Sequence, residues 1–118
     1  MAIILYHNPR CSKSRQTLQL LQERDYQPEV VEYLKTPPSE QELAAILALL
    51  KLAPRALMRR KEAEYTEHNL DDASLTESQL IAAMVAHPKL IERPIVVVDG
   101  QRAAIGRPPE QVLAVLEA

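Results

Sequence analysis

A single cysteine, Cys11, stands in the most chemically suggestive segment of this 118-residue chain. That segment covers residues 7–15, follows the apolar stretch 2–6, and precedes residues with the periodicity of an amphipathic helix. A strand that ends in a turn at Pro9 and leads into a helix would place Cys11 at the helix N-terminus, where unpaired N–H groups favour negative charge. Because the thiolate is the nucleophilic form of cysteine, the sequence predicts a reactive thiol of lowered pKa.

The charge distribution supports this prediction. Residues 1–22 contain Arg10, Lys13 and Arg15 and no acidic residue, whereas all 16 acidic residues and the other 11 basic ones follow later in the chain. An approaching anion therefore meets a cationic stretch around the cysteine. The competing interpretation is that Cys11 is a small buried hydrophobic residue, but such cysteines are normally flanked by apolar rather than cationic residues.

Composition narrows the classes of function. Hydrophobic residues make up 47% of the chain, enough for the core of one compact domain, while an aromatic content of 3% argues against stacking on nucleic-acid bases. A net charge of −2 likewise argues against nucleic-acid binding. One cysteine permits no intrachain disulfide and no apolar stretch reaches membrane-spanning length, so we expect a cytoplasmic protein with no membrane contact.

Neither a metal site nor a phosphate-binding loop is evident. The three histidines, at positions 7, 68 and 87, are scattered, and Cys11 has no partner at zinc-ligand spacing. The two glycines, Gly100 and Gly106, do not open a strand-to-helix unit. We expect no metal and no tightly bound cofactor.

Cys11 must be positioned by the elements around it. Residues 2–6 are apolar throughout, which is typical of a strand covered on both faces and indicates an interior place in a sheet. Residues 12–24 form an amphipathic helix, and residues 29–33 a second strand. A strand, a helix and a strand in this order predict a parallel pair with a right-handed crossover.

The middle of the chain is predicted to be helical. Ser39 with Glu42, and Thr76 with Gln79, have capping-box spacing ahead of apolar periodic residues. A short helical segment is expected from residue 53 to about residue 64, a polar connection over 65–74, and a helix end at residues 87–88.

The end of the chain predicts a β-hairpin and a helix. Residues 95–98 and 102–105 flank Asp99-Gly100, a dipeptide that supplies the positive φ of a tight turn, and residues 109–117 form the last helix. The fold class is therefore α/β: a four-stranded mixed sheet with helices on both faces, in one domain (1–118) with a helical insertion at about 39–87.

This order of elements, with a cysteine at the first helix and a proline entering the third strand, resembles the thioredoxin-like, glutaredoxin-like fold. Four separated segments then resemble the glutaredoxin- and glutathione-linked arsenate reductase family. They are residues 6–15 (YHNPRCSKSR), 55–59 (RALMR), 90–97 (LIERPIVV) and 106–110 (GRPPE).

The resemblance implies an oxidoreductase of arsenic detoxification, in which Cys11 attacks arsenate and Arg59, Arg93 and Arg107 bind the oxyanion. Guanidinium groups suit this task because each offers parallel donors to two oxygens of a tetrahedral anion. Arg60, which adjoins Arg59, is expected to be solvated. In such a site the Cys11 sulfur would be ionised, open to solvent and surrounded by the guanidinium groups of these three arginines.

Four further residues have expected roles at this site. The resemblance implies that Pro94 follows a cis peptide bond and faces the sulfur. Ser14 lies one helical turn after Cys11, so it either donates to the thiolate or caps its own helix. A protonated His7 would lower the Cys11 pKa, although a loop imidazole bonded to backbone is the alternative. Arg15 is a candidate for charge support.

Turnover requires an external thiol, because no second cysteine exists to resolve a Cys11 adduct. The resemblance implies glutathione as co-substrate and a glutaredoxin as partner. Two alternatives stay open: a glutathione-dependent thiol oxidoreductase with another substrate, and a binding module like the Spx-type transcription regulators. Those regulators commonly carry a C-x-x-C switch, and Ser14 in place of a second cysteine counts against that reading.

Overall fold

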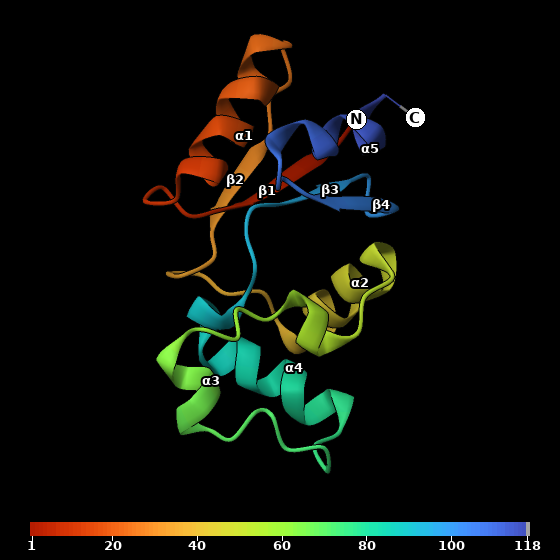
Figure 1. Cartoon of the computed structure of the whole chain (residues 1–118). Coiled ribbons are helices and arrows are strands. Elements are labelled where there is room, and N and C mark those ends of the chain that lie inside the picture. The colour runs from red at the N-terminus through yellow and green to blue at the C-terminus, as the bar shows by residue number, and fades with distance from the viewer. Residues whose placement is uncertain (118) are drawn as a thin grey trace. The chain divides into compact units, whose positions relative to one another are not determined.

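A computed structural model describes residues 1–117 of the chain (Figure 1). The chain divides into two compact units. The sheet unit comprises Met1–Thr36 and the chain from Arg93 onward, and the helical unit comprises Pro37–Glu92. The helical unit corresponds to the predicted insertion and extends it by a few residues at either end.

The sheet unit holds all four strands found in the described chain. They are β1 (Ile3–His7), β2 (Glu29–Glu32), β3 (Ile95–Val98) and β4 (Arg102–Ile105), in the order β2-β1-β3-β4. β1 pairs in parallel with β2 and antiparallel with β3, and β3 pairs antiparallel with β4. The predicted interior place of the first strand is confirmed, and the architecture is that of the thioredoxin-like α/β fold.

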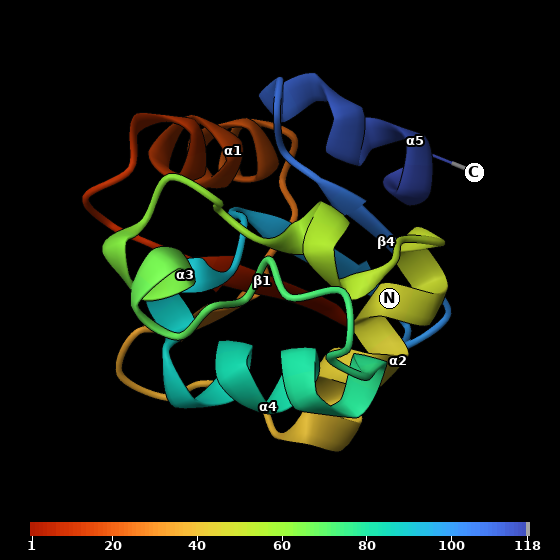
Figure 2. The same cartoon turned by 60° about the horizontal axis from the view of Figure 1, so that its bottom comes forward.

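One face of this sheet is covered by α1 (Ser12–Glu23), η3 (Pro109–Val112) and α5 (Leu113–Leu116), as Figure 2 shows. Apolar side chains from these helices and from β1 and β3 form one buried cluster. Its members are Ile3, Leu5, Leu21, Val96, Val98, Val112 and Leu116. Full burial of an aliphatic side chain contributes about 1.5–3 kcal/mol, so this cluster is what holds α1 against β1 and β3.

The hairpin between β3 and β4 turns as its sequence predicts. Asp99 and Gly100 have φ values of 54° and 63°, the left-handed conformation typical of the two central residues of such a tight turn, which the Gln101 N–H closes by donating to the Val98 carbonyl at 3.0 Å. The last helix differs from the prediction, because residues 109–112 form a 3₁₀ turn and only Leu113–Leu116 are α-helical. Pro109 at the start lacks an N–H donor, which favours the tighter first turn.

The helical unit contains α2 (Glu40–Leu50), η1 (Pro54–Leu57), α3 (Ala63–Glu67), α4 (Glu77–Ala86) and η2 (Pro88–Leu90). Both predicted capping boxes are present. The Ser39 hydroxyl accepts from the Glu42 N–H at 3.0 Å, and the Thr76 hydroxyl accepts from the Gln79 N–H at 3.2 Å. Each such cap satisfies N–H groups that a helix N-terminus leaves unpaired.

Residues 53–74 differ from the prediction of one helical segment followed by a polar connection. The segment is split into η1 and α3, because Met58 leaves the helical conformation to form an isolated antiparallel bridge with Ile91. The expected polar connection begins inside α3 and buries two apolar side chains, Tyr65 and Leu70. The Arg55 guanidinium donates to the backbone carbonyls of Leu70 and Asp72, which ties this connection down.

Candidate active site

Cys11 is the residue that precedes the first turn of α1, as the sequence predicts. Its backbone is extended, with φ of −93° and ψ of 125°, and its N–H donates to the Asn8 carbonyl at 3.0 Å, which closes the turn before the helix. Only 9% of the residue is exposed. The expectation of a solvent-open sulfur is therefore wrong in degree, because the residue is largely buried and the Arg107 side chain contacts its sulfur.

The pKa of the Cys11 thiol is lower than its ordinary value despite this burial. Burial raises the pKa, but four other groups together lower it by more than burial raises it. They are the Ser14 backbone N–H, the Arg93 guanidinium, the Lys13 backbone N–H and the Arg107 guanidinium. The Cys11 side chain makes no capping hydrogen bond. The Ser14 and Lys13 N–H groups still favour negative charge on the sulfur, as expected at a helix N-terminus.

Arg107 makes a direct cationic contact with the sulfur. Its Nη1 lies 3.9 Å from Cys11 Sγ and also donates to the Arg93 carbonyl oxygen at 3.3 Å. Both Arg93-Pro94 and Arg107-Pro108 are cis peptide bonds; the resemblance implied the first and not the second. The sheet unit thus brings the thiol and two of the three expected arginines to one place.

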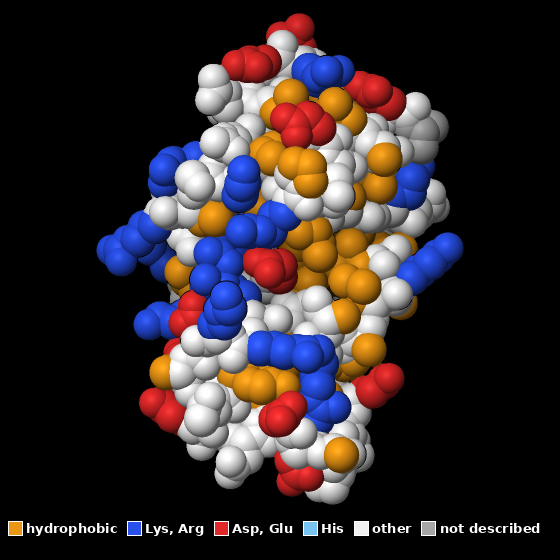
Figure 3. Space-filling model, in the orientation of Figure 1, with side chains coloured by type: hydrophobic (Ala, Val, Ile, Leu, Met, Phe, Trp, Pro, Cys, Tyr) orange, Lys and Arg blue, Asp and Glu red, His pale blue; other side chains and the backbone are white. Residues whose placement is uncertain are grey.

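Figure 3 shows blue side chains gathered at the level of the N-terminal end of α1. In the sheet unit, the exposed cationic residues among the first 36 residues of the chain, near β1, α1 and β2, include Arg10, Arg15 and Lys35. Arg15 donates to the Pro9 carbonyl at 3.0 Å, so it supports the turn before Cys11. It also lowers the pKa of His7, although less than burial does. Charge support of the thiol by Arg15 stays a prediction.

His7 and Ser14 form a hydrogen-bonded pair under the turn. The Ser14 hydroxyl lies 2.7 Å from His7 Nδ1 and accepts from the Asn8 N–H at 3.0 Å, so it does not cap its own helix. His7 ends β1 rather than lying in a loop. Burial lowers the pKa of His7, Glu32 opposes this and Arg15 adds to it. A neutral His7 bonded to Ser14 replaces the expected cation beside the thiol.

Arg59 belongs to the helical unit, and there its guanidinium pairs with a carboxylate. Arg59 Nη1 lies 2.7 Å from Glu62 Oε1, with each side chain about a quarter exposed. Arg60 is exposed, as expected. Sequence reasoning missed Glu62, although its i,i+3 spacing from Arg59 is the ordinary signal for such a pair. The function of Arg59 as an oxyanion ligand stays a prediction.

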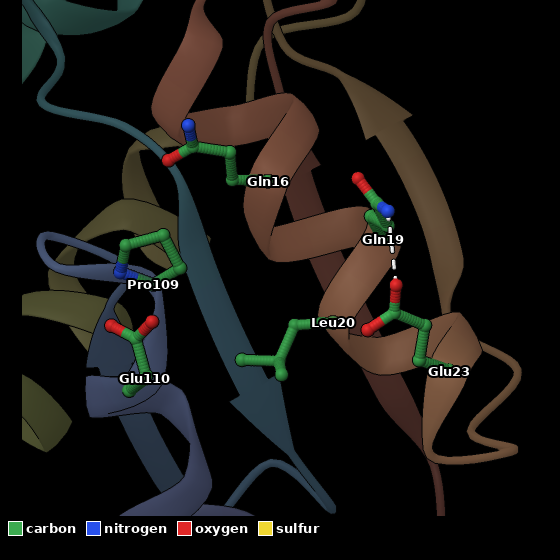
Figure 4. Close-up of a pocket in the computed structure, with 6 residues that line it drawn as sticks. All are labelled: Gln16, Gln19, Leu20, Glu23, Pro109 and Glu110. Carbon is green, nitrogen blue, oxygen red and sulfur yellow. Dashed lines mark hydrogen bonds between the residues drawn. The ribbon is translucent and has the colours of Figure 1, made fainter.

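The sheet unit contains two hollows at its surface. One, of about 210 Å³, is lined by His7, Asn8, Pro9, Arg10, Glu32, Leu34 and Lys35. The other, of about 370 Å³, is lined by Gln16, Gln19, Leu20, Glu23, Pro109 and Glu110 (Figure 4). It holds no nucleophile, and its carboxylates, Glu23 and Glu110, would repel an oxyanion. One of them, Glu23, accepts a hydrogen bond from the Gln19 amide at 2.9 Å.

Within residues 1–117, no group of three or more His, Cys, Asp or Glu side chains is arranged to hold a metal ion. None of the helices in this part of the chain has the length and apolar character of a membrane span. The groups gathered at the site are the Cys11 thiol, the N–H groups of the first turn of α1 and the guanidinium groups of Arg93 and Arg107. Such a set favours nucleophilic attack on an anionic electrophile, since the cations reduce like-charge repulsion.

Comparison with known proteins places this geometry in a family. The chain is 58% identical over 113 residues to the uncharacterized protein YfgD of Escherichia coli K12, covering 95% of this chain and 94% of that one. It is 50% identical over 115 residues to a protein named arsenate reductase from Neisseria meningitidis serogroup B, covering 97% of both chains.

A solved structure described as arsenate reductase from Vibrio cholerae superposes with a TM-score of 0.93 at 53% identity, covering 98% of both chains. The profile of the ArsC family matches residues 6–115, which include Cys11, Arg59, Arg93 and Arg107. A match over nearly the whole chain agrees with the thioredoxin-like sheet and with the cysteine at the start of α1. The chain belongs to the ArsC family.

Proposed function

We propose that this protein is an arsenate reductase that uses Cys11 as nucleophile and depends on glutathione and a glutaredoxin. The observation that carries the proposal is the contact of 3.9 Å between Arg107 Nη1 and Cys11 Sγ at the N-terminus of α1. It joins an activated thiolate to a donor suited to a tetrahedral oxyanion. The names of the relatives from Neisseria meningitidis and Vibrio cholerae support arsenate as the substrate.

The first step forms a bond between Cys11 sulfur and arsenic and breaks one bond between arsenic and oxygen. The oxygen leaves as hydroxide and takes up a proton to become water, while arsenic stays in the +5 state. Charge redistributes over the remaining oxygens, where the guanidinium donors of Arg93 and Arg107 are most useful because they are already in place.

The next steps need thiols from outside the chain, because Cys11 is its one cysteine. Glutathione displaces a second oxygen as water and forms a second bond between sulfur and arsenic. A glutaredoxin thiolate then attacks the glutathione sulfur and breaks its bond to arsenic. The electron pair of the broken sulfur–arsenic bond passes to arsenic, which becomes arsenic(III). Water finally displaces Cys11 as thiolate and releases arsenite, so two electrons reach arsenic and one mixed disulfide forms.

A coupled assay tests this function. The full chain is mixed with arsenate, glutathione, a glutaredoxin, glutathione reductase and NADPH, and the absorbance of NADPH is followed. We expect NADPH consumption that requires arsenate and falls sharply when either glutathione or the glutaredoxin is omitted. A rate that is the same with and without arsenate would contradict the proposal. With the glutaredoxin omitted and a glutathione mixed disulfide in place of arsenate, NADPH consumption that requires this protein would favour the thiol oxidoreductase alternative.

The Glu62 carboxylate is expected to compete with oxyanions for Arg59. If Arg59 binds arsenate as the resemblance implies, Glu62→Gln removes the charge paired with it at 2.7 Å and should lower the KM for arsenate about 3- to 10-fold. Steady-state kinetics at fixed ionic strength measure this change. Glu64→Gln, two residues away in α3, is the matched control.

The expected pattern is a lower KM in Glu62→Gln and an unchanged KM in Glu64→Gln. An unchanged or higher KM in Glu62→Gln would contradict competition between Glu62 and arsenate for Arg59. The prediction concerns only the arginine of the helical unit and leaves the Cys11 chemistry intact.

A further inference from the structure

Gly106, the residue between β4 and Arg107, lies where no side chain has room. A Cβ atom at this position would overlap with Thr17 Oγ1 and would lie 2.8 Å from Cγ of Pro94. Real Cβ atoms essentially never approach other atoms so closely. The φ angle of Gly106 is not in the left-handed region, so this glycine is required for close approach and not for its backbone conformation.

The partner surface of Gly106 is fixed on α1. Thr17 is fully buried, and its hydroxyl donates to the Lys13 carbonyl at 2.8 Å. This bond holds Oγ1 on the helix and makes the contact with Gly106 a contact with the helix itself. Lys13 is also one of the two residues whose N–H groups lower the pKa of the Cys11 thiol.

A second bond fixes the other side of Gly106. Its N–H donates to the Pro94 carbonyl at 3.0 Å, which joins the turn after β4 to the segment before β3. The next residue, Arg107, reaches both Cys11 Sγ, at 3.9 Å, and the Arg93 carbonyl, at 3.3 Å. Gly106 is thus the point at which α1, the Arg93-Pro94 segment and the Arg107 turn meet.

We propose that the Thr17–Gly106 contact is a positioning device, which sets how closely the Arg107 guanidinium approaches the Cys11 sulfur. Thr17 lies on the helix whose N-terminus holds Cys11, and Arg107 follows Gly106 directly in the chain. The spacing between the Cys11 sulfur and the Arg107 guanidinium therefore follows from the Thr17–Gly106 contact. Thr17 and Gly106 are positioning residues and touch no reacting atom. The inference concerns the thiol itself and does not require arsenate to be the substrate.

The contact matters because the effect of a cation on a thiolate falls as their separation grows. A Cβ at position 106 must push the Arg107 turn away from α1, since the Thr17 hydroxyl is held by Lys13 and the Pro94 ring is buried. The thiolate then loses part of its stabilisation while its helix stays folded. The expected result is a higher pKa of the Cys11 thiol.

The test is the pH dependence of Cys11 alkylation by iodoacetamide, with thermal unfolding measured on each protein. We expect Gly106→Ala to move the alkylation midpoint upward by about 0.5–1 pH unit. Thr17→Ala removes the hydroxyl that would collide, so the double variant with Gly106→Ala should recover part of the shift. It also provides a folded protein for the measurement if Gly106→Ala alone does not fold.

Gly100→Ala is the matched control. Gly100 lies at the far end of the hairpin, with φ of 63° and nothing within 4 Å of an added Cβ. Alanine there strains the turn and lowers the unfolding temperature, but it does not touch α1, so the alkylation midpoint should stay unchanged. This control separates positioning from a general loss of stability.

A double-mutant cycle with Arg107→Gln decides the point. If Gly106 acts by placing Arg107, the effect of Gly106→Ala on the midpoint must disappear once the Arg107 charge is gone. An equal upward shift in the Arg107→Gln background would overturn the proposal, as would an unchanged midpoint in folded Gly106→Ala. Neither result depends on arsenate turnover, so failure here is distinct from failure of the proposed function.

Discussion

Cys11→Ser is expected to abolish arsenate reduction, with kcat/KM lower by at least about 10³-fold. A serine hydroxyl stays protonated at the N-terminus of α1, because the N–H dipoles and the two guanidinium groups that lower the pKa of a thiol do not ionise so weak an acid. The lack of a second cysteine leaves no other thiol in the chain to take its place. The NADPH-coupled assay, with protein folding checked by circular dichroism, measures the loss.

A relocated thiol is the control for this prediction. The double variant Cys11→Ser, Ser12→Cys keeps one thiol but places it one residue later on α1, turned by about 100° around the helix axis. Ser12 is exposed, so the new thiol should react with iodoacetamide yet fail to reduce arsenate. Measurable arsenate turnover by either variant would mean that catalysis does not proceed through a sulfur held at position 11.

Arg107→Gln is expected to produce the second largest loss, about 10²–10³-fold in kcat/KM for arsenate. Two effects combine, because the same guanidinium stabilises the Cys11 thiolate and provides donors for the oxyanion.

Stabilisation of the thiolate determines how the reactivity of Cys11 depends on pH. In the wild type the lowered pKa means that the thiolate is present below the ordinary thiol range, and alkylation falls only as pH drops through that lowered value.

Loss of Arg107 raises the pKa, so the alkylation midpoint should move upward and part of the lost arsenate activity should return as the pH is raised. The part that does not return reports the missing oxyanion donors. Arg107→Lys should recover more of the thiol pKa than of kcat/KM, because an ammonium supplies charge without the planar fork that matches two oxygens.

Arg24→Gln is the matched control for the loss of an arginine from this unit. Arg24 follows the C-terminal end of α1 and pairs with Glu117 at 2.8 Å, with about half of each side chain exposed. Exposed ion pairs of this kind contribute little, so neither the alkylation midpoint nor kcat/KM should change noticeably. An Arg107→Gln protein that behaves like Arg24→Gln would contradict the role assigned to the 3.9 Å contact.

The thiol illustrates how opposing effects decide reactivity. Burial alone would make Cys11 an inert core cysteine, and it is the largest single influence on the pKa of this group. Four smaller influences outweigh it, two from N–H groups of the same helix turn and two from arginines far along the chain. Because the balance depends on their sum, removing one arginine is expected to change the reactivity of the sulfur noticeably.

The sequence by itself predicted what depends on neighbouring residues. Capping boxes at Ser39 and Thr76 and the Asp99-Gly100 turn are local, because each joins groups three residues apart or fewer. The position of Cys11 before α1 is local in the same sense. The apolar stretch before it indicated an interior strand, since such a strand needs apolar residues on both faces. The family resemblance added which arginines to look for.

The tertiary structure decided what depends on distant residues. Arg107 and Cys11 are 96 positions apart, and nothing in either local sequence specifies the 3.9 Å between them. That distance arises where the Arg107 turn meets α1 at Gly106 and Thr17. The hydrogen bond between His7 and Ser14 and the bridge between Met58 and Ile91, which interrupts the helical segment, likewise join separate elements of the fold. Side-chain packing and hydrogen bonds across elements choose among conformations that local propensity leaves nearly equal in energy.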